Sequence, residues 1–253
     1  MPFTFAHPLY AAPLKRIAPR MFSLTGLVLG SMSPDFEYFI ALEPHQTIGH
    51  TATGLLQQAL PLSLLLAFMF HCIVKNALIE HLPSCRGWSA RAKTLAQAYP
   101  WRFDSWRDWL VFAVSVAIGF YSHVFIDGFT HATGAYVQRL SMLQQPLLLE
   151  LPAYKILQHG LSLIGLSTGL LVVFRLLKRM PAKHSETSAP SARNKLFYWG
   201  IVAATTVATV MGKLLVTSSS NVIGIFVVAI ISGCVLGVLL ASIVVMVKNK
   251  YSH

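Results

Sequence analysis

Five long apolar segments constrain the fold of this chain more than any other feature of its sequence. They lie at residues 53–75, 107–127, 156–177, 196–216 and 222–247. A helix crosses the hydrocarbon core of a membrane with about 20 mostly apolar residues, because its backbone hydrogen bonds are satisfied internally. A sixth apolar run, at residues 21–34, is too short for a comfortable crossing and is expected to form a short or re-entrant helix. The sequence therefore predicts an all-α, polytopic membrane helix bundle with five to six transmembrane helices.

The composition agrees with a membrane protein and excludes an ordinary soluble domain. Hydrophobic residues make up 55% of the chain and charged residues only 11%, whereas a soluble domain has roughly 25% charged residues. A net charge of +11 can indicate nucleic-acid binding. Here, however, Lys and Arg lie between the apolar segments, where they set orientation and meet lipid headgroups. We therefore expect membrane lipid as a partner and no nucleic acid.

The positions of Lys and Arg predict how the helices are oriented. Residues 76–107, residues 178–195 and the C-terminal tail are rich in positive charge, so they are expected on the cytoplasmic side. Residues 128–155 and 217–221 carry few positive charges and are expected outside. This orientation predicts a multi-pass membrane protein whose C-terminus is cytoplasmic.

A polar segment at residues 178–195 divides the chain. Its Pro, Ser, Ala and Lys content cannot bury enough apolar area to fold, so it is expected to be a cytoplasmic linker. It would separate a membrane-embedded His- and Asp-bearing helical domain (1–177) from a C-terminal transmembrane helix pair with a basic tail (196–253). Gly233 and Gly237 form a GxxxG pattern that favours close helix contact and is compatible with a homodimer.

Ionisable side chains gather at the outer ends of the predicted N-terminal helices. Asp35, His50, His123, Asp127 and His159 are candidate metal ligands, and Glu37 and His131 are candidate proton acceptors. An Asp at the centre of a membrane helix costs about 2.5–3.5 kcal/mol on insertion scales, so such residues are seldom present without a role. The three cysteines form no CxxC pattern, so a metal site here would use imidazoles and carboxylates.

The spacing of the best pair suits a metal ion. His123 and Asp127 are four residues apart, so they lie about 6 Å apart on one face of a helix and can share an ion. His131 is eight residues from His123, about 12 Å along a straight helix. It reaches the same ion only if the helix breaks, for which Gly128 is the candidate; otherwise it serves a second metal or a substrate phosphate. Imidazole with carboxylate favours a divalent transition metal (zinc first, then manganese or iron).

Each candidate also has a structural interpretation without a ligand role. His7 can be a surface histidine, and Asp35 can cap the start of a helix. Glu37 and His50 can be solvated groups at the membrane interface. His159 can form a hydrogen bond within the bundle or act as an outer-shell group.

Several motifs, in order, carry a family resemblance. They are MPFTFAHP, GSMSPDFEYF, HTATGLL, GFYSHVFIDGFTH and YKILQHG. Over residues 1 to about 175 the chain resembles an uncharacterised bacterial membrane family, domain of unknown function 4184. This resemblance implies a location in the bacterial inner (cytoplasmic) membrane.

A more distant resemblance concerns function. The order of the motifs is similar to that of the membrane-bound predicted metal-dependent hydrolases, which are related in motif to zinc-dependent phospholipase C. By that likeness His7, Asp35, His50, His123 and Asp127 would be metal ligands. The chain departs from the pattern at Glu37, which stands where a second aspartate falls, and in GHTATG, which lacks the double histidine.

These observations predict a metal-dependent hydrolase that acts on a lipid-linked or phosphoester substrate at the outer membrane–water boundary. Zinc lowers the pKa of a bound water to about 7, and Glu37 or His131 would be the proton acceptor. The alternative is a non-enzymatic membrane protein, a transporter or an assembly factor, in which His123 and Asp127 form an ion or proton relay.

Overall fold

The long apolar segments are all helical. The computed structural model describes residues 3–83, 87–148, 150–182 and 190–251. Within these residues, five stretches are long and apolar enough to cross a membrane: Ala52–His81, Trp106–Arg139, Ala153–Arg179, Ala192–Val216 and Val222–Tyr251. The short run at residues 21–34 forms a helix of nine residues that is not among them. The predicted all-α fold with five to six spanning helices is therefore confirmed, with five.

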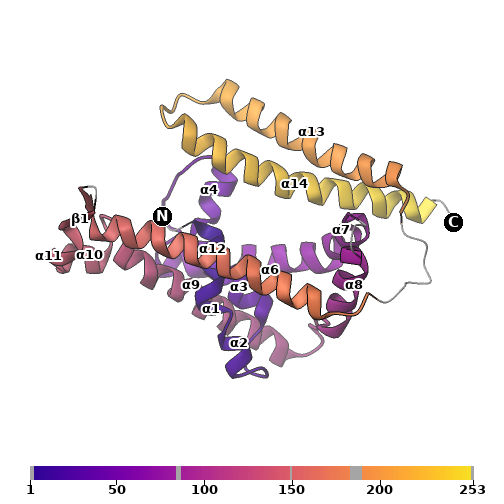
Figure 1. The fold of residues 1–253 in the computed structure, drawn as a ribbon, viewed down its shortest axis with the longest axis horizontal. Coiled ribbons are helices and arrows are strands. Elements are labelled where there is room, and N and C mark those ends of the chain that lie inside the picture. Colours follow the sequence, from indigo (N-terminus) through magenta and orange to yellow (C-terminus); the bar gives the residue numbers. More distant parts are fainter. Residues whose placement is uncertain (1–2, 84–86, 149, 183–189, 252–253) are drawn as a thin grey trace. The chain divides into compact units, whose positions relative to one another are not determined.

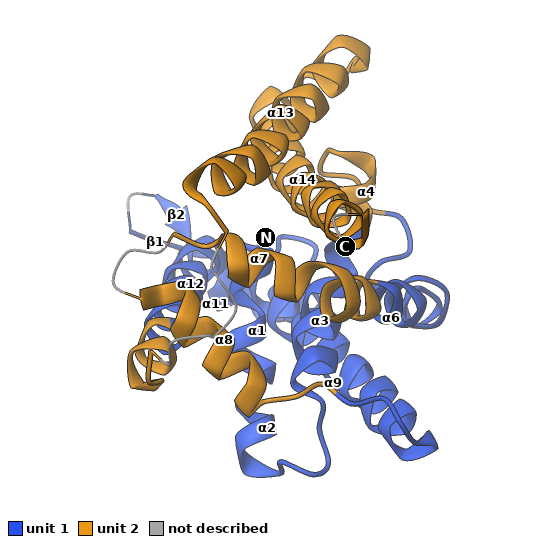
Figure 2. Cartoon of the chain, turned by 90° about the vertical axis from the view of Figure 1, so that its right-hand side faces the viewer, with its two compact units in different colours: residues 1–36, 47–65, 102–173 blue, residues 37–46, 66–101, 174–253 orange. Residues whose placement is uncertain are grey.

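The chain forms two compact units, which are coloured separately in Figure 2. The first contains residues 1–36, 47–65 and 102–173, and the second contains residues 37–46, 66–101 and 174–253. Part of the predicted linker, residues 183–189, lies outside the described residues. At its two ends the chain is helical, up to Arg179 and again from Ala192. The predicted domain boundaries stay predictions.

Most of the longer elements of the first unit are labelled in Figure 1. The elements of this unit are η1 (Thr4–Ala6), α1 (Pro8–Ala11), α2 (Leu14–Ile17), α3 (Leu24–Met32), η2 (Ser33–Asp35), α5 (Ala52–Gly54), η3 (Leu55–Ala59), the start of α6 (Leu60–Phe68), α9 (Trp106–Thr130), α10 (Ala135–Arg139), α11 (Ser141–Gln144), β1 (Pro146–Leu148), β2 (Leu151–Pro152) and most of α12 (Ala153–Arg179). The two strands pair as an antiparallel hairpin.

Small residues bring α3 and α9 into backbone contact. A Cβ atom added at Gly30 would lie 2.6 Å from the Val116 Cα, and one added at Gly119 would lie 2.5 Å from the Leu27 carbonyl oxygen. Lipid tails are as apolar as leucine, so close backbone packing of this kind drives helix association in membranes. The crossing therefore depends on glycines at these two positions.

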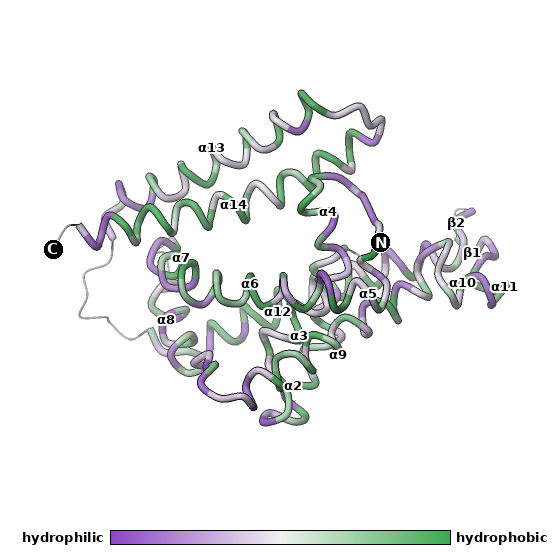
Figure 3. Tube along the Cα trace, turned by 180° about the vertical axis from the view of Figure 1, so that it is seen from behind, coloured by the Kyte–Doolittle hydropathy of each residue, from purple (hydrophilic) through white to green (hydrophobic). Residues whose placement is uncertain are grey.

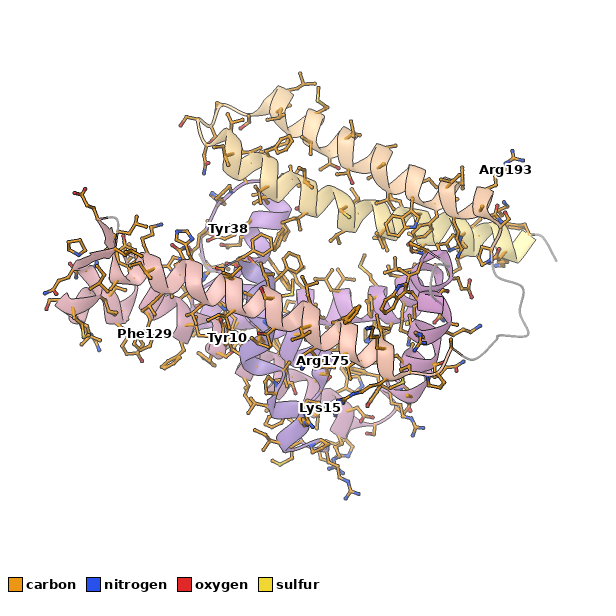
Figure 4. The ribbon with its side chains drawn as sticks, viewed as in Figure 1. Tyr10, Lys15, Tyr38, Phe129, Arg175 and Arg193 are labelled. Atoms are coloured by element: carbon orange, nitrogen blue, oxygen red, sulfur yellow. The ribbon has the colours of Figure 1, made fainter. Side chains whose placement is uncertain are left out.

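The N-terminal segment packs against α12. The Tyr10 hydroxyl, labelled in Figure 4, donates to the Leu161 carbonyl oxygen at 2.9 Å. The Phe3 backbone N–H donates to Ser162 Oγ at 2.9 Å. A Cβ at Gly165 would lie 2.6 Å from the Ala6 Cβ. These contacts bury the segment that carries His7.

The second unit is built around a helical hairpin. Its elements are α4 (Phe36–Ala41), η4 (Met69–Val74), α7 (Lys75–His81), α8 (Trp88–Ala98), α13 (Ala192–Val216) and α14 (Val222–Tyr251). Figure 3 shows that α14 is hydrophobic over most of its length. The GxxxG glycines face α13: a Cβ at Gly233 would lie 2.9 Å from the Thr206 Cα, and one at Gly237 would lie 2.8 Å from the Val202 Cα. That motif therefore serves packing within the chain, and the homodimer stays a prediction.

Candidate metal centre

Five of the residues predicted as ligands converge within the first unit. His7 lies between η1 and α1, Asp35 ends η2, His50 precedes α5, and His123 and Asp127 lie on α9. Two overlapping groups could each hold a metal ion, His7–His123–Asp127 and Asp35–His50–His123. Within each group the ligand atoms lie within 4.8 Å of one another. The buried His and Asp groups of this unit could therefore bind a metal ion.

The carboxylates stand among the imidazole rings. Asp127 Oδ2 lies 3.1 Å from both His50 Nε2 and His123 Nε2, and Asp127 Oδ1 lies 3.5 Å from His7 Nε2. Asp35 Oδ1 lies 3.7 Å from His123 Nε2 and 3.9 Å from His50 Nε2. Three ring nitrogens and two carboxylates thus face a common centre.

The hydrogen bonding of His123 determines which of its nitrogens is free. Its Nδ1 lies 2.7 Å from the Ser31 carbonyl oxygen, and because a carbonyl only accepts, Nδ1 carries a proton. In the neutral ring Nε2 is then an acceptor, yet it faces Asp127 and Asp35, which also accept. A proton shared between these atoms, or a metal cation among them, relieves this repulsion. A histidine that binds a metal through one nitrogen commonly donates from the other to a backbone carbonyl.

The cluster leaves several buried polar atoms without a hydrogen-bond partner. They are both ring nitrogens of His7, His50 Nδ1, Asp35 Oδ1 and Asp127 Oδ1. An unsatisfied buried group of this kind costs about 1–3 kcal/mol. Among the described residues, no Lys or Arg forms an ion pair with either carboxylate. With both carboxylates ionised and the three imidazoles neutral, the donor set would carry a charge of −2, which a divalent cation balances.

Burial shapes the titration of His7 and Asp35, which lie outside the spanning helices. Burial, and then the charge of His123, lowers the pKa of His7 to about 2. The His7 ring also stacks on the His123 ring, with centroids 3.7 Å apart. Burial raises the pKa of Asp35, whose Oδ2 accepts a hydrogen bond from Thr4 Oγ1 at 2.5 Å. His7 is therefore a neutral imidazole, the form that binds metals.

A tight turn positions His50. Thr51 Oγ1 donates to the Ile48 carbonyl oxygen at 2.7 Å and accepts from the Gly54 backbone N–H at 3.0 Å, which caps α5. A Cβ at Gly54 would lie 2.8 Å from the Ile48 carbonyl carbon, so only glycine lets the turn close this tightly. The His50 side chain is 17% exposed, the most accessible imidazole of the five residues.

His131 reaches the cluster without the helix break that its spacing suggested. The break at Gly128, one of the alternatives for His131, does not occur, because α9 runs through Gly128 to Thr130. His131 follows directly, and the turn of the chain at the helix end brings its Nδ1 within 3.6 Å of Asp127 Oδ1. The same nitrogen lies 3.1 Å from the Asp127 carbonyl oxygen, so Nδ1 carries the proton and Nε2 is the acceptor in the neutral ring.

Besides His131, which contacts Asp127 without belonging to either group, two predicted residues lie outside both groups. His159 is exposed on α12 and belongs to neither group among the described residues. Glu37 lies in α4, which belongs to the second unit apart from its first residue, and is likewise in neither group. In the motif YKILQHG the buried polar side chain is that of Gln158, which is 4% exposed, and not that of His159. Sequence reasoning missed Gln158 and Thr4, although both lie inside the quoted motifs.

Comparison with known proteins gives a family and no characterised relative. No curated protein and no solved structure matches the chain. The model of one family, described as "Domain of unknown function (DUF4184)", matches residues 1–243. This match covers most of both units, including all five residues of the cluster. The chain therefore belongs to the DUF4184 family.

Proposed function

We propose that this protein is a membrane-embedded, zinc-dependent hydrolase that acts on a lipid-linked or phosphoester substrate at the outer membrane–water boundary. The observation that carries the proposal is the state of His123. Its Nδ1 is held by the Ser31 carbonyl, while its Nε2 faces two carboxylates that no Lys or Arg neutralises among the described residues. A divalent cation between them would satisfy these groups, and imidazole and carboxylate ligands suit zinc.

The residues of the first unit would have the following roles. The ion would draw its ligands from His7, His50, His123, Asp35 and Asp127, and because His123 offers a single free nitrogen, the two overlapping groups would share one ion. Bound there, zinc supplies a Lewis acid and an activated water for hydrolysis. His131, whose side chain is 25% exposed, accepts a proton at Nε2 while its Nδ1–H stays bonded to the Asp127 carbonyl. The proposal does not use Glu37 or His159.

Turnover tests the proposal directly. The purified chain is incubated with phospholipids, isoprenoid phosphates and nucleotides. Hydrolysis of one class should stop with a chelator and return with zinc. His131→Gln keeps an N–H for the Asp127 carbonyl but has no basic nitrogen, so it should retain zinc and lose turnover by about 100-fold, the smaller end of general-base effects. Chelator-insensitive turnover, or none in the zinc-loaded protein, would favour the ion or proton relay.

The outer location depends on the orientation of the helices and has its own test. In a variant without the native cysteines, Ser219→Cys should react with a membrane-impermeant thiol reagent in intact cells. Ala90→Cys and Ser188→Cys should react only after lysis, because the Lys- and Arg-rich segments that contain them are expected inside. Labelling of position 188 in intact cells would reverse the orientation and place the cluster at the cytoplasmic boundary.

A further inference from the structure

A cavity adjoins the cluster within the first unit. It has a volume of about 340 Å³ and is lined by residues 130–133, at the end of α9, and by Tyr154, Lys155 and Gln158 of α12. Small-molecule sites typically have about 300–1,000 Å³. His131 lines this cavity and also lies 3.6 Å from Asp127. A ligand in the cavity is thus one side chain away from the proposed ion.

The walls of the cavity are held by local packing. A Cβ at Gly134 would lie 2.8 Å from the Asp127 carbonyl oxygen, so the turn after α9 folds directly onto the end of that helix. Val137, Leu143 and Ala153 form a buried apolar cluster, against which Tyr154 packs. Phe129, labelled in Figure 4, packs on the same cluster at the end of α9. The residues that line the cavity thus belong to segments that are packed within the unit.

The charge of the lining favours an anion. Lys155 is its one Lys or Arg, and the lining contains no Asp or Glu among the described residues. Lys155 also lies in the first turn of α12, a helix of 27 residues, where backbone N–H groups and the helix dipole favour negative charge. Both features suit a phosphate.

Gln158 indicates a second property of the ligand, a hydrogen-bond donor. It lies one turn beyond Lys155, on the same face of α12, and is only 4% exposed. Its Oε1 is buried without a hydrogen-bond partner. An amide oxygen accepts hydrogen bonds, so a ligand with a hydroxyl group would supply the missing donor.

We propose that this cavity binds a phosphate ester that also carries a free hydroxyl, of the phosphoglycerol class. Its phosphate lies against Lys155 and the start of α12, and its hydroxyl donates to Gln158. The assignment of this ligand as the substrate rests on the proposed hydrolase function, but binding in the cavity does not require it. Phosphoglycerol occurs both as a free metabolite and as a lipid headgroup, and the site recognises what the two share.

Binding is measured with the full-length protein in phosphatidylcholine nanodiscs, by calorimetric titration with glycerol 1-phosphate and with methyl phosphate, which has no free hydroxyl. Lys155→Met should weaken binding of both about tenfold or more, as expected for loss of a charge-assisted hydrogen bond, and Lys155→Arg should recover most of it. Gln158→Leu should weaken glycerol 1-phosphate about fivefold and leave methyl phosphate unchanged. Lys178→Met, near the other end of α12, is the matched control. Circular dichroism checks that each variant is folded.

Nanodiscs that contain phosphatidylglycerol distinguish the two sources of the ligand. Weaker apparent binding of glycerol 1-phosphate there means that the lipid headgroup occupies the cavity, whereas unchanged binding assigns the free ester.

No binding of either form to the wild type, or equal binding by folded Lys155→Met, overturns the proposal. Zinc is measured in the same samples. Zinc-free protein with Lys155-dependent binding would refute the hydrolase but support the binding site. Zinc-loaded protein without such binding would refute the binding site but leave the hydrolase standing.

Discussion

Replacing Asp127 with asparagine is expected to remove bound metal from a protein that stays folded. Asp127 is the one residue of the cluster that lies within 4 Å of four histidines, namely His7, His50, His123 and His131. Loss of a single outer-shell partner already weakens metal affinity by about 10–100-fold, so loss of this ligand's charge should weaken it by roughly 100-fold or more. The new amide can donate to the imidazole nitrogens, so the packing of α9 should survive.

The measurement is the zinc content of detergent-purified protein after dialysis, by elemental analysis. Wild type should hold about one ion per chain, because His123 has one free nitrogen for both groups. His159→Ala is the informative control, since the sequence alone made His159 a ligand and the structure leaves it exposed. It should keep its zinc. Wild-type zinc content in Asp127→Asn, or no zinc in the wild type, would refute the metal centre.

Gly30→Ala should strongly destabilise the first unit. The added Cβ would meet the backbone of Val116, with the carbonyl oxygen closest and the Cα at 2.6 Å, and a backbone cannot move aside as a flexible side chain can. Overpacking typically costs about 1–3 kcal/mol and occasionally more, so we expect the free energy of unfolding to fall by about 3 kcal/mol. Separation of α3 from α9 would also draw the Ser31 carbonyl away from His123, so metal should be lost as well.

Thermal unfolding in detergent checks this expectation. A loss of about 3 kcal/mol corresponds to a fall in Tm of roughly 6–12 °C for a chain of this size. Gly160→Ala is the matched control, because Gly160 is also helical and a Cβ there meets no atom within 4 Å. It should leave Tm unchanged or raise it slightly, since alanine favours a helix by about 1 kcal/mol over glycine. Equal Tm values for the two variants would mean that α3 and α9 do not meet in this way.

The sequence by itself determined the features that depend on neighbouring residues. Hydropathy over about 20 residues identified the helices, and the four-residue spacing of His123 and Asp127 placed them on one face of α9. The short run at residues 21–34 was recognised by its length alone. These are local properties, because the bilayer requires each spanning segment to satisfy its own backbone hydrogen bonds whatever its neighbours are.

Only the tertiary structure decided which distant residues meet. His7 looks like a surface residue in the sequence, yet its ring is fully buried against His123, because Ala6 and Tyr10 pack the segment onto α12. On α12 the sequence drew attention to His159, whereas the helix buries its neighbour Gln158. Spanning helices are apolar on every side, so their hydropathy does not indicate which face turns inward. That choice comes from close packing at small residues, which forms only when the helices are together.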